Sequence, residues 1–241
     1  MDSLPSSAYS DHAAIEPDFA FNNSNLDQED DTTPAEVLSE MKVSWQNEVA
    51  SPILLPHRFD AAECLIDQID GIEENLARQS DKTAPWIAIH RMEQQRLTYI
   101  VNDYIRVRLA KIEQNPRWLL KEHERRIQMY NPSVEEHPVE LLAPQELEFA
   151  KRYAESEGIL LGNTFLGRLP PALRKIAVSE LDTEFDRVFA EVMVDDVEQV
   201  VVPDYQDPTS DVLVGLEKDS VHLIAFNSVQ NQIERGQVRL L

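Results

Sequence analysis

The feature that most constrains this chain is a long helical segment near its middle. Residues 84–113 contain no glycine, and their only proline, Pro85, falls in the first helical turn, where proline is tolerated. Apolar residues recur at spacings of three and four in two neighbouring stripes. The first stripe is Leu97, Val101, Ile105, Leu109 and Ile112, and the second is Ile100, Tyr104 and Val107.

A surface helix of a single domain needs only one apolar stripe. The predicted helix is about 45 Å long, since each residue adds about 1.5 Å. We expect a chain of this size to cover one side of the helix, which leaves the other side for a partner protein. The pattern therefore favours a component of an assembly over a free-standing enzyme.

Composition restricts the class of protein further. The chain has 241 residues, a formal net charge of −22 and a single cysteine, Cys64. Such an acidic surface repels phosphate, which argues against tight binding of duplex DNA by this chain alone. One cysteine cannot form an internal disulfide, so we expect a reducing compartment. No apolar run reaches the roughly 20 residues that span a bilayer, and we expect neither a signal peptide nor membrane association.

Local signals divide the chain into segments. Residues 1–31 hold eight acidic residues and no Lys or Arg, and we predict a disordered acidic tail there. Thr33, Pro34 and Glu36 form a capping box that starts a helix, which ends before Pro52. Further helices are expected at residues 57–79 and 84–113. Pro116 either ends the long helix or begins a short one. Another helix is expected from Pro144, with fraying near Gly158 and Gly162.

The pattern changes after the Pro170–Pro171 connector. From about Phe185 the apolar period moves toward two and β-branched residues accumulate, which is typical of strands. A brief helix from Ser228 to Arg235, ended by Gly236, precedes a last strand. We therefore predict an α+β fold, in which an N-terminal bundle of about five helices precedes a small β-rich domain. The expected bounds are 32–165 for the helical domain, 166–185 for a linker and 186–241 for the β-rich domain.

Motifs of catalysis are not found in the sequence. It contains no phosphate-binding glycine loop, no His-Glu-x-x-His and no Gly-x-Ser-x-Gly. The six histidines show no metal-ligand spacing, and Cys64 is expected to be a packed thiol. We predict no catalytic, cofactor-binding or metal-binding residue.

The long helix and several other blocks resemble one protein family. The helix reads Ile89-His90-x-Met92-Glu93-x-x-Arg96-x-x-Tyr99 and continues as Tyr104-Ile105-Arg106-x-Arg108-Leu109-x-Lys111-Ile112. Trp45-x-Asn47-Glu48, Pro52-x-Leu54-Leu55, Glu73-Glu74-Asn75-Leu76 and Leu216-Glu217-Lys218-x-Ser220-x-His222-Leu223-Ile224 occur in the same order. Together they resemble the Sld-five subunit family of the GINS complex. Asp219 stands where that family has a glycine, and Asp tolerates the left-handed backbone of such a turn.

The resemblance implies a function that composition does not reveal. It implies a non-catalytic subunit in the nucleus, assembled with three Psf-type subunits into a heterotetramer. That tetramer would join the MCM helicase assembly and other replication factors in the replicative DNA helicase, for initiation and elongation of DNA replication. Direct contact with DNA stays open.

Ten residues are the candidates for partner contacts, because aromatic residues and Arg often anchor interfaces. They are Trp45, Leu54, Leu55, Tyr99, Tyr104, Arg106, Arg108, Ile112, Leu240 and Leu241. For Trp45, Leu54 and Leu55 the chain's own core is an equal alternative. The competing functions are a nucleic-acid-binding module that uses the basic long helix, a generic helical adaptor, and an enzyme whose site another subunit completes.

Overall fold

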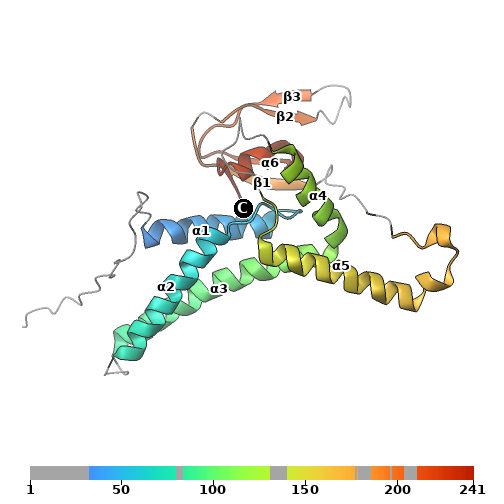
Figure 1. The fold of residues 1–241 in the computed structure, drawn as a ribbon. Coiled ribbons are helices and arrows are strands. Elements are labelled where there is room, and N and C mark those ends of the chain that lie inside the picture. Colours follow the sequence, from blue (N-terminus) through green and yellow to red (C-terminus); the bar gives the residue numbers. More distant parts are fainter. Residues whose placement is uncertain are drawn as a thin grey trace, which may run out of the picture. The chain divides into compact units, whose positions relative to one another are not determined.

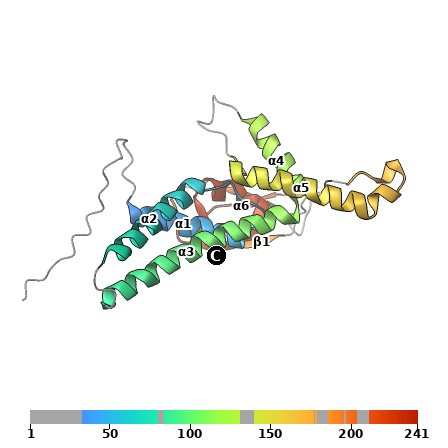
Figure 2. The same cartoon turned by 60° about the horizontal axis from the view of Figure 1, so that its bottom comes forward.

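The structure of the chain is a computed structural model. It describes residues 33–79, 84–130, 140–176, 178, 186–195, 197–203 and 211–241. The predicted acidic tail lies outside these residues. Figures 1 and 2 show the described helices and strands from two directions.

The first helices begin where local chemistry predicts. Helix α1 covers Pro34–Ala50, and its capping box is formed: the Thr33 N–H donates to Glu36 Oε2 (2.8 Å), and the Glu36 N–H donates to Thr33 Oγ1 (3.3 Å). Helix α2 covers Phe59–Arg78 and the long helix α3 covers Pro85–Gln114. The three helices pack together, and α2 and α3 run side by side in both views (Figures 1 and 2).

The expected open side of the long helix is closed by the chain itself. The described core of α1, α2 and α3 takes residues from both predicted stripes, with Leu97 and Val101 from the first and Ile100 and Tyr104 from the second. Met41 of α1 and Leu65 of α2 fill the space between them. The expectation that one whole stripe faces a partner is therefore wrong, because both stripes contribute side chains to the internal cores of the chain.

Two further helices follow the long one. Pro116 begins a helix, α4 (Pro116–Met129), and α5 covers Pro144–Thr164. Helix α5 continues past Gly158 and Gly162, where fraying was expected. The 3₁₀ turns η1 (Leu166–Arg168) and η2 (Pro171–Leu173) follow it. A second core joins α3, α4 and α5 through Leu54, Ile112, Leu119, Leu141, Leu142 and Ala150.

The described strands occur where the apolar period becomes two. Strands β1 (Arg187–Val192), β4 (Val221–Ala225) and β5 (Val238–Leu240) form an antiparallel sheet in the order β4-β1-β5. Strands β2 (Val200–Pro203) and β3 (Asp211–Val214) form a separate antiparallel pair. Helix α6 (Phe226–Glu234) packs on the sheet. These elements and the helices before them confirm the α+β fold class.

Two tight turns also agree with the sequence. Asp219 has φ 61° in the turn before β4, so it adopts the left-handed backbone expected there, and Gly236 has φ 71° between α6 and β5.

The core under the sheet includes Ile53 and Leu55 from the segment after α1. The C-terminal strands therefore pack against the end of α1. Among the described residues, no helix combines the length and apolar character that a membrane span requires.

Candidate partner interface

The structure separates the ten predicted interface residues into two groups. Six of them are buried within the chain: Leu54, Leu55, Tyr104, Arg108, Ile112 and Leu240. In this structure these six hold the chain's own elements together and do not lie on an open surface. Tyr99, Arg106 and Leu241 are exposed and Trp45 is half-buried, so partner contact by these four stays a prediction.

Arg108 shows why the buried group is internal. It lies in α3 with an exposed fraction of 0%, and a guanidinium has five N–H donors. Two donors bind the Glu146 carboxylate of α5, with Nε–Oε1 at 2.7 Å and Nη2–Oε2 at 2.8 Å. A third binds Glu48 Oε2 of α1 at 3.0 Å. The remaining two bind the main-chain oxygens of Leu55 (2.7 Å) and Leu141 (3.0 Å), so all five donors have acceptors.

Lys111 extends this network by one turn of α3. Its ammonium donates to Glu48 Oε1 (2.7 Å) and to the main-chain oxygens of Glu48 (2.5 Å) and Ile53 (2.9 Å). We call Glu48, Arg108, Lys111 and Glu146 the Arg108 cluster. It contains two cations and two carboxylates, and it joins α1, α3, α5 and the segment after α1.

The environment of the cluster raises the pKa of Arg108 and lowers the pKa of Lys111. Burial by itself lowers the pKa of Arg108, but the Glu146 hydrogen bonds and the Glu48 charge outweigh it, and the pKa rises above its ordinary value. Burial lowers the pKa of Lys111, and the Glu48 carboxylate opposes that shift. Arg108 therefore stays charged inside the protein, where it neutralises buried carboxylates.

The Trp45-x-Asn47-Glu48 motif now has a physical explanation. The Trp45 Nε1–H donates to Asp103 Oδ2 of α3 (2.8 Å), and the Tyr99 ring lies edge-on to the indole at 6.2 Å. Asn47 Oδ1 accepts the buried Leu240 N–H (2.7 Å), and Glu48 belongs to the Arg108 cluster. Each named residue of the motif fixes α1 to another part of the chain.

The exposed part of α3 forms a different stripe. Ile89, Met92, Arg96, Tyr99 and Arg106 are all exposed, and their spacings place them on one side of the helix, where Tyr99 also contacts Trp45 of α1. We call these five residues the outer stripe of α3. Our prediction included Tyr99 and Arg106 but missed Ile89, Met92 and Arg96, although all three stand in the quoted motif. Their spacings of three and four were the signal that could have found them.

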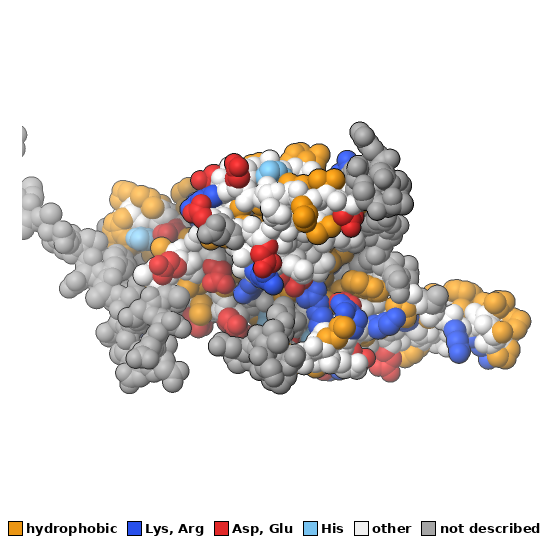
Figure 3. Space-filling model, turned by 90° about the horizontal axis from the view of Figure 1, so that it is seen from above, with side chains coloured by type: hydrophobic (Ala, Val, Ile, Leu, Met, Phe, Trp, Pro, Cys, Tyr) orange, Lys and Arg blue, Asp and Glu red, His pale blue; other side chains and the backbone are white. Residues whose placement is uncertain are grey.

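Other apolar side chains are exposed away from α3. Figure 3 shows hydrophobic side chains gathered at the right-hand end of the view, where α5 ends and η1 and η2 follow. The large exposed residues of this region are Ile159, Leu160, Phe165 and Leu173. Cys64 is also exposed, so the expectation of a packed thiol is wrong.

Comparisons with known proteins identify the family. The family described as DNA replication complex GINS protein SLD5 C-terminus matches residues 184–241. Proteins named DNA replication complex GINS protein SLD5 from Homo sapiens and Bos taurus are 34% and 33% identical, and each match covers 87% of this chain and 91% of the relative. The chain belongs to the SLD5 family. A relative of the same name from Arabidopsis thaliana is 24% identical over 83% of this chain and 89% of its own length.

The SLD5 family assignment confirms the resemblance seen in the sequence. The matches to the mammalian relatives extend over most of the chain, so they include helices as well as the C-terminal strands. The relatives' name places them in a DNA replication complex. In the described part of this SLD5 family chain, no group of three or more His, Cys, Asp or Glu residues is placed to hold a metal ion.

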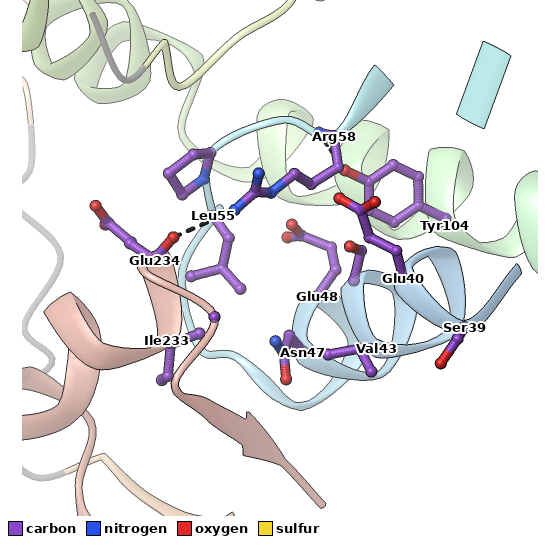
Figure 4. A pocket seen from close by; sticks show the side chains of 13 residues that line it. Ser39, Glu40, Val43, Asn47, Glu48, Leu55, Arg58, Tyr104, Ile233 and Glu234 are labelled. Carbon is purple, nitrogen blue, oxygen red and sulfur yellow. Dashed lines mark hydrogen bonds between the residues drawn. The ribbon is translucent and has the colours of Figure 1, made fainter. Parts of the chain in front are cut away.

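A cavity of about 230 Å³ lies where α1 meets the C-terminal elements of this SLD5 family chain. Figure 4 shows Val43, Asn47 and Glu48 of α1 on one side and Ile233 and Glu234 of α6 on the other. Arg58 Nη2 donates to the Glu234 main-chain oxygen (3.2 Å), and the Arg58 N–H donates to the buried Tyr104 hydroxyl (3.1 Å). These hydrogen bonds join the start of α2 to α3 and α6, so the cavity marks the joint between the helices and the C-terminal elements.

Proposed function

We propose that this chain is a non-catalytic structural subunit of a GINS heterotetramer that also contains three Psf-type subunits. In this proposal the tetramer works in the nucleus and joins the MCM helicase assembly and other replication factors. ATP hydrolysis belongs to the MCM motor, and the tetramer supports initiation and elongation of DNA replication. The observation that carries the proposal is the 34% identity to a GINS protein over 87% of this chain.

The outer stripe of α3 supports the role of an assembly subunit. Ile89, Met92 and Tyr99 expose more than half of their side chains, and Arg96 and Arg106 lie between and beyond them. The stripe spans residues 89–106, about 25 Å of helix at about 1.5 Å per residue. Exposed apolar residues in a row with Arg are typical of helix-to-helix interfaces. A partner helix laid along this stripe would remove these side chains from water.

The nucleic-acid-binding alternative loses much of its basis. It depended on basic residues of the long helix and its exit, several of which are paired within the chain. Arg108 and Lys111 belong to the buried cluster, and Arg117 pairs with Glu157 at 2.9 Å. Arg126 pairs with Glu234 at 2.9 Å. Fewer cations are therefore available for phosphate, and the net charge of −22 opposes binding further.

The test is co-expression of this chain with three Psf-type subunits, followed by native mass spectrometry. We expect one copy of each subunit in the complex, and sparse or aggregated protein when this chain is expressed alone. Deletion of residues 1–31 should leave the complex intact, because that segment has no core-forming pattern. A soluble monomer that binds none of the three subunits would overturn the proposal.

The outer stripe can be tested with a matched pair of variants. Met92 in α3 and Met129 in α4 both have an exposed fraction of 70%. We expect Met92→Glu to weaken complex formation, because it places a charge in the middle of the apolar contact, and Met129→Glu to have little effect. Equal behaviour of the two variants would show that the stripe is not the contact surface.

A further inference from the structure

The cavity beside α1 contains a buried polar group that the chain itself leaves unused. Asn47 is only 6% exposed, and its Oδ1 accepts the Leu240 N–H, which fixes the orientation of the amide. The two N–H donors of Nδ2 have no partner among the described residues. Figure 4 shows this nitrogen turned toward the open space of the cavity and the oxygen turned away from it. A buried donor without an acceptor is unfavourable, so the cavity is built for a ligand that supplies one.

The rest of the lining supplies an acceptor and an apolar wall. The Glu48 carboxylate accepts one hydrogen bond at Oε2 from Arg108 and one at Oε1 from Lys111. Each carboxylate oxygen has about two acceptor positions, so Glu48 can accept a further bond from a ligand. Val43, Leu55 and Ile233 line the cavity with aliphatic side chains.

These groups select the charge of the ligand. A cation in the cavity would face the N–H donors of Asn47, and an anion would face the Glu48 carboxylate and that of Glu40 at the rim. The Arg108 cluster is balanced in charge, so it does not call for either sign. A neutral group with an acceptor and a donor side by side satisfies both Asn47 and Glu48.

We propose that this cavity binds a primary carboxamide on a short aliphatic stem. The ligand oxygen accepts from Asn47 Nδ2, its nitrogen donates to Glu48, and the stem packs on Val43, Leu55 and Ile233. A cavity of about 150 Å³ holds benzene, so the 230 Å³ here has room for about nine non-hydrogen atoms. Water needs two to four polar partners, and the aliphatic wall offers none, so a ligand with an apolar stem fits this lining better than water.

Three isosteric probes test the chemistry on the soluble fraction of the full chain. They are 3-methylbutanamide, its carboxylate analogue 3-methylbutanoate and its amine analogue 3-methylbutylamine, followed by saturation-transfer NMR. We expect the amide to bind with a dissociation constant in about the millimolar range and the two charged probes to bind at least about tenfold more weakly. No binding of the amide, which would leave the cavity with water alone, or equal binding of all three probes would overturn the inference.

Two kinds of variant locate the probe. Asn47→Asp keeps an oxygen for the Leu240 N–H but removes the Nδ2 donors, and we expect it to weaken amide binding at least about tenfold. Val43→Phe fills the cavity without removing a described hydrogen bond and should abolish binding. Its matched control is Val49→Phe, because Val49 lies on the same helix with 51% exposure and does not line the cavity. If Asn47→Asp does not fold, the valine pair decides, and binding by Val43→Phe equal to that of Val49→Phe would overturn the inference.

The same probe distinguishes the two sources of a carboxamide, a free small amide and a Gln or Asn side chain of a partner protein. A free amide leaves the cavity open in the co-expressed complex, so the probe binds the complex and the isolated chain alike. A partner side chain fills the cavity, so the probe binds the isolated chain only. Both results support the inference, and the measurements on the isolated chain do not depend on the proposed assembly.

Discussion

Replacement of Arg108 by methionine tests whether buried hydrogen bonds and ion pairs within the chain stabilise the packing of the long helix. The variant keeps a long side chain but removes all five hydrogen bonds of the guanidinium. Glu146 then keeps a single described hydrogen bond, from the Ala143 N–H (3.1 Å), while Glu48 keeps Lys111. Removal of one partner from a buried ion pair costs about 3–5 kcal/mol. Since domains are stable by only about 5–15 kcal/mol, we expect a severe loss of stability.

Urea unfolding of the soluble fraction of the full chain, followed by circular dichroism, measures this loss. With a denaturant dependence of about 2 kcal/mol/M, the midpoint should fall by about 1.5–2.5 M. Arg106→Met is the matched control, because Arg106 lies on the same helix and is exposed, and it should change the free energy of unfolding by less than about 0.5 kcal/mol.

A second substitution separates charge burial from loss of packing. In Arg108→Met the dominant cost is the uncompensated carboxylate of Glu146. Adding Glu146→Leu should therefore recover part of the lost stability, because it removes that buried charge. A midpoint for Arg108→Met within about 0.3 M of the unmodified chain would refute the reasoning.

Three further predictions concern single contacts. Asn47→Ala leaves the buried Leu240 N–H without its acceptor, and we expect a loss of about 1–3 kcal/mol in the free energy of unfolding and faster hydrogen exchange at Leu240. His123 Nδ1 accepts the Leu142 N–H (3.3 Å), and burial lowers the pKa of His123, so the unfolded chain binds the proton more readily. The melting temperature should therefore fall as the pH drops below about 6.5, and His123→Gln should reduce that slope. Asp219→Gly should raise the free energy of unfolding by about 0.5–1 kcal/mol, and with it the melting temperature, because φ is 61° at this position. An unchanged or lower melting temperature would contradict this prediction.

Local patterns predicted most of the elements. The capping box at Thr33 predicts a helix start, and the change of period after Phe185 predicts the strands; of the two possibilities at Pro116, the structure has the start of a helix. The helix starts and the period of two depend on neighbouring residues, so a sequence displays them directly. The left-handed Asp219 was expected only from the family resemblance, because that family has a glycine there and Asp tolerates the same backbone.

Long-range partners could not be predicted in the same way. Arg108 has the charge of a surface residue. The sequence does not show that it pairs with Glu48 and Glu146, because they lie 60 and 38 positions away. Tyr104 looked like an interface aromatic, yet its hydroxyl accepts the Arg58 N–H and its ring is buried. For both residues, chemical type suggested a contact correctly, but the partner is in the same chain.

The location of the exposed apolar surface changes what assembly requires. Because both predicted stripes of α3 contribute side chains to the chain's own cores, the exposed apolar surface of the described residues includes the outer stripe of α3, the end of α5, and Phe189, Leu223 and Leu241 in the C-terminal elements. These regions lie on separate elements, so one partner helix cannot cover all of them. An assembly that buries them all must contact the chain at several places, and loss of any one contact should weaken it without abolishing the others. That distribution fits a subunit surrounded by several partners better than a binary adaptor with one binding face.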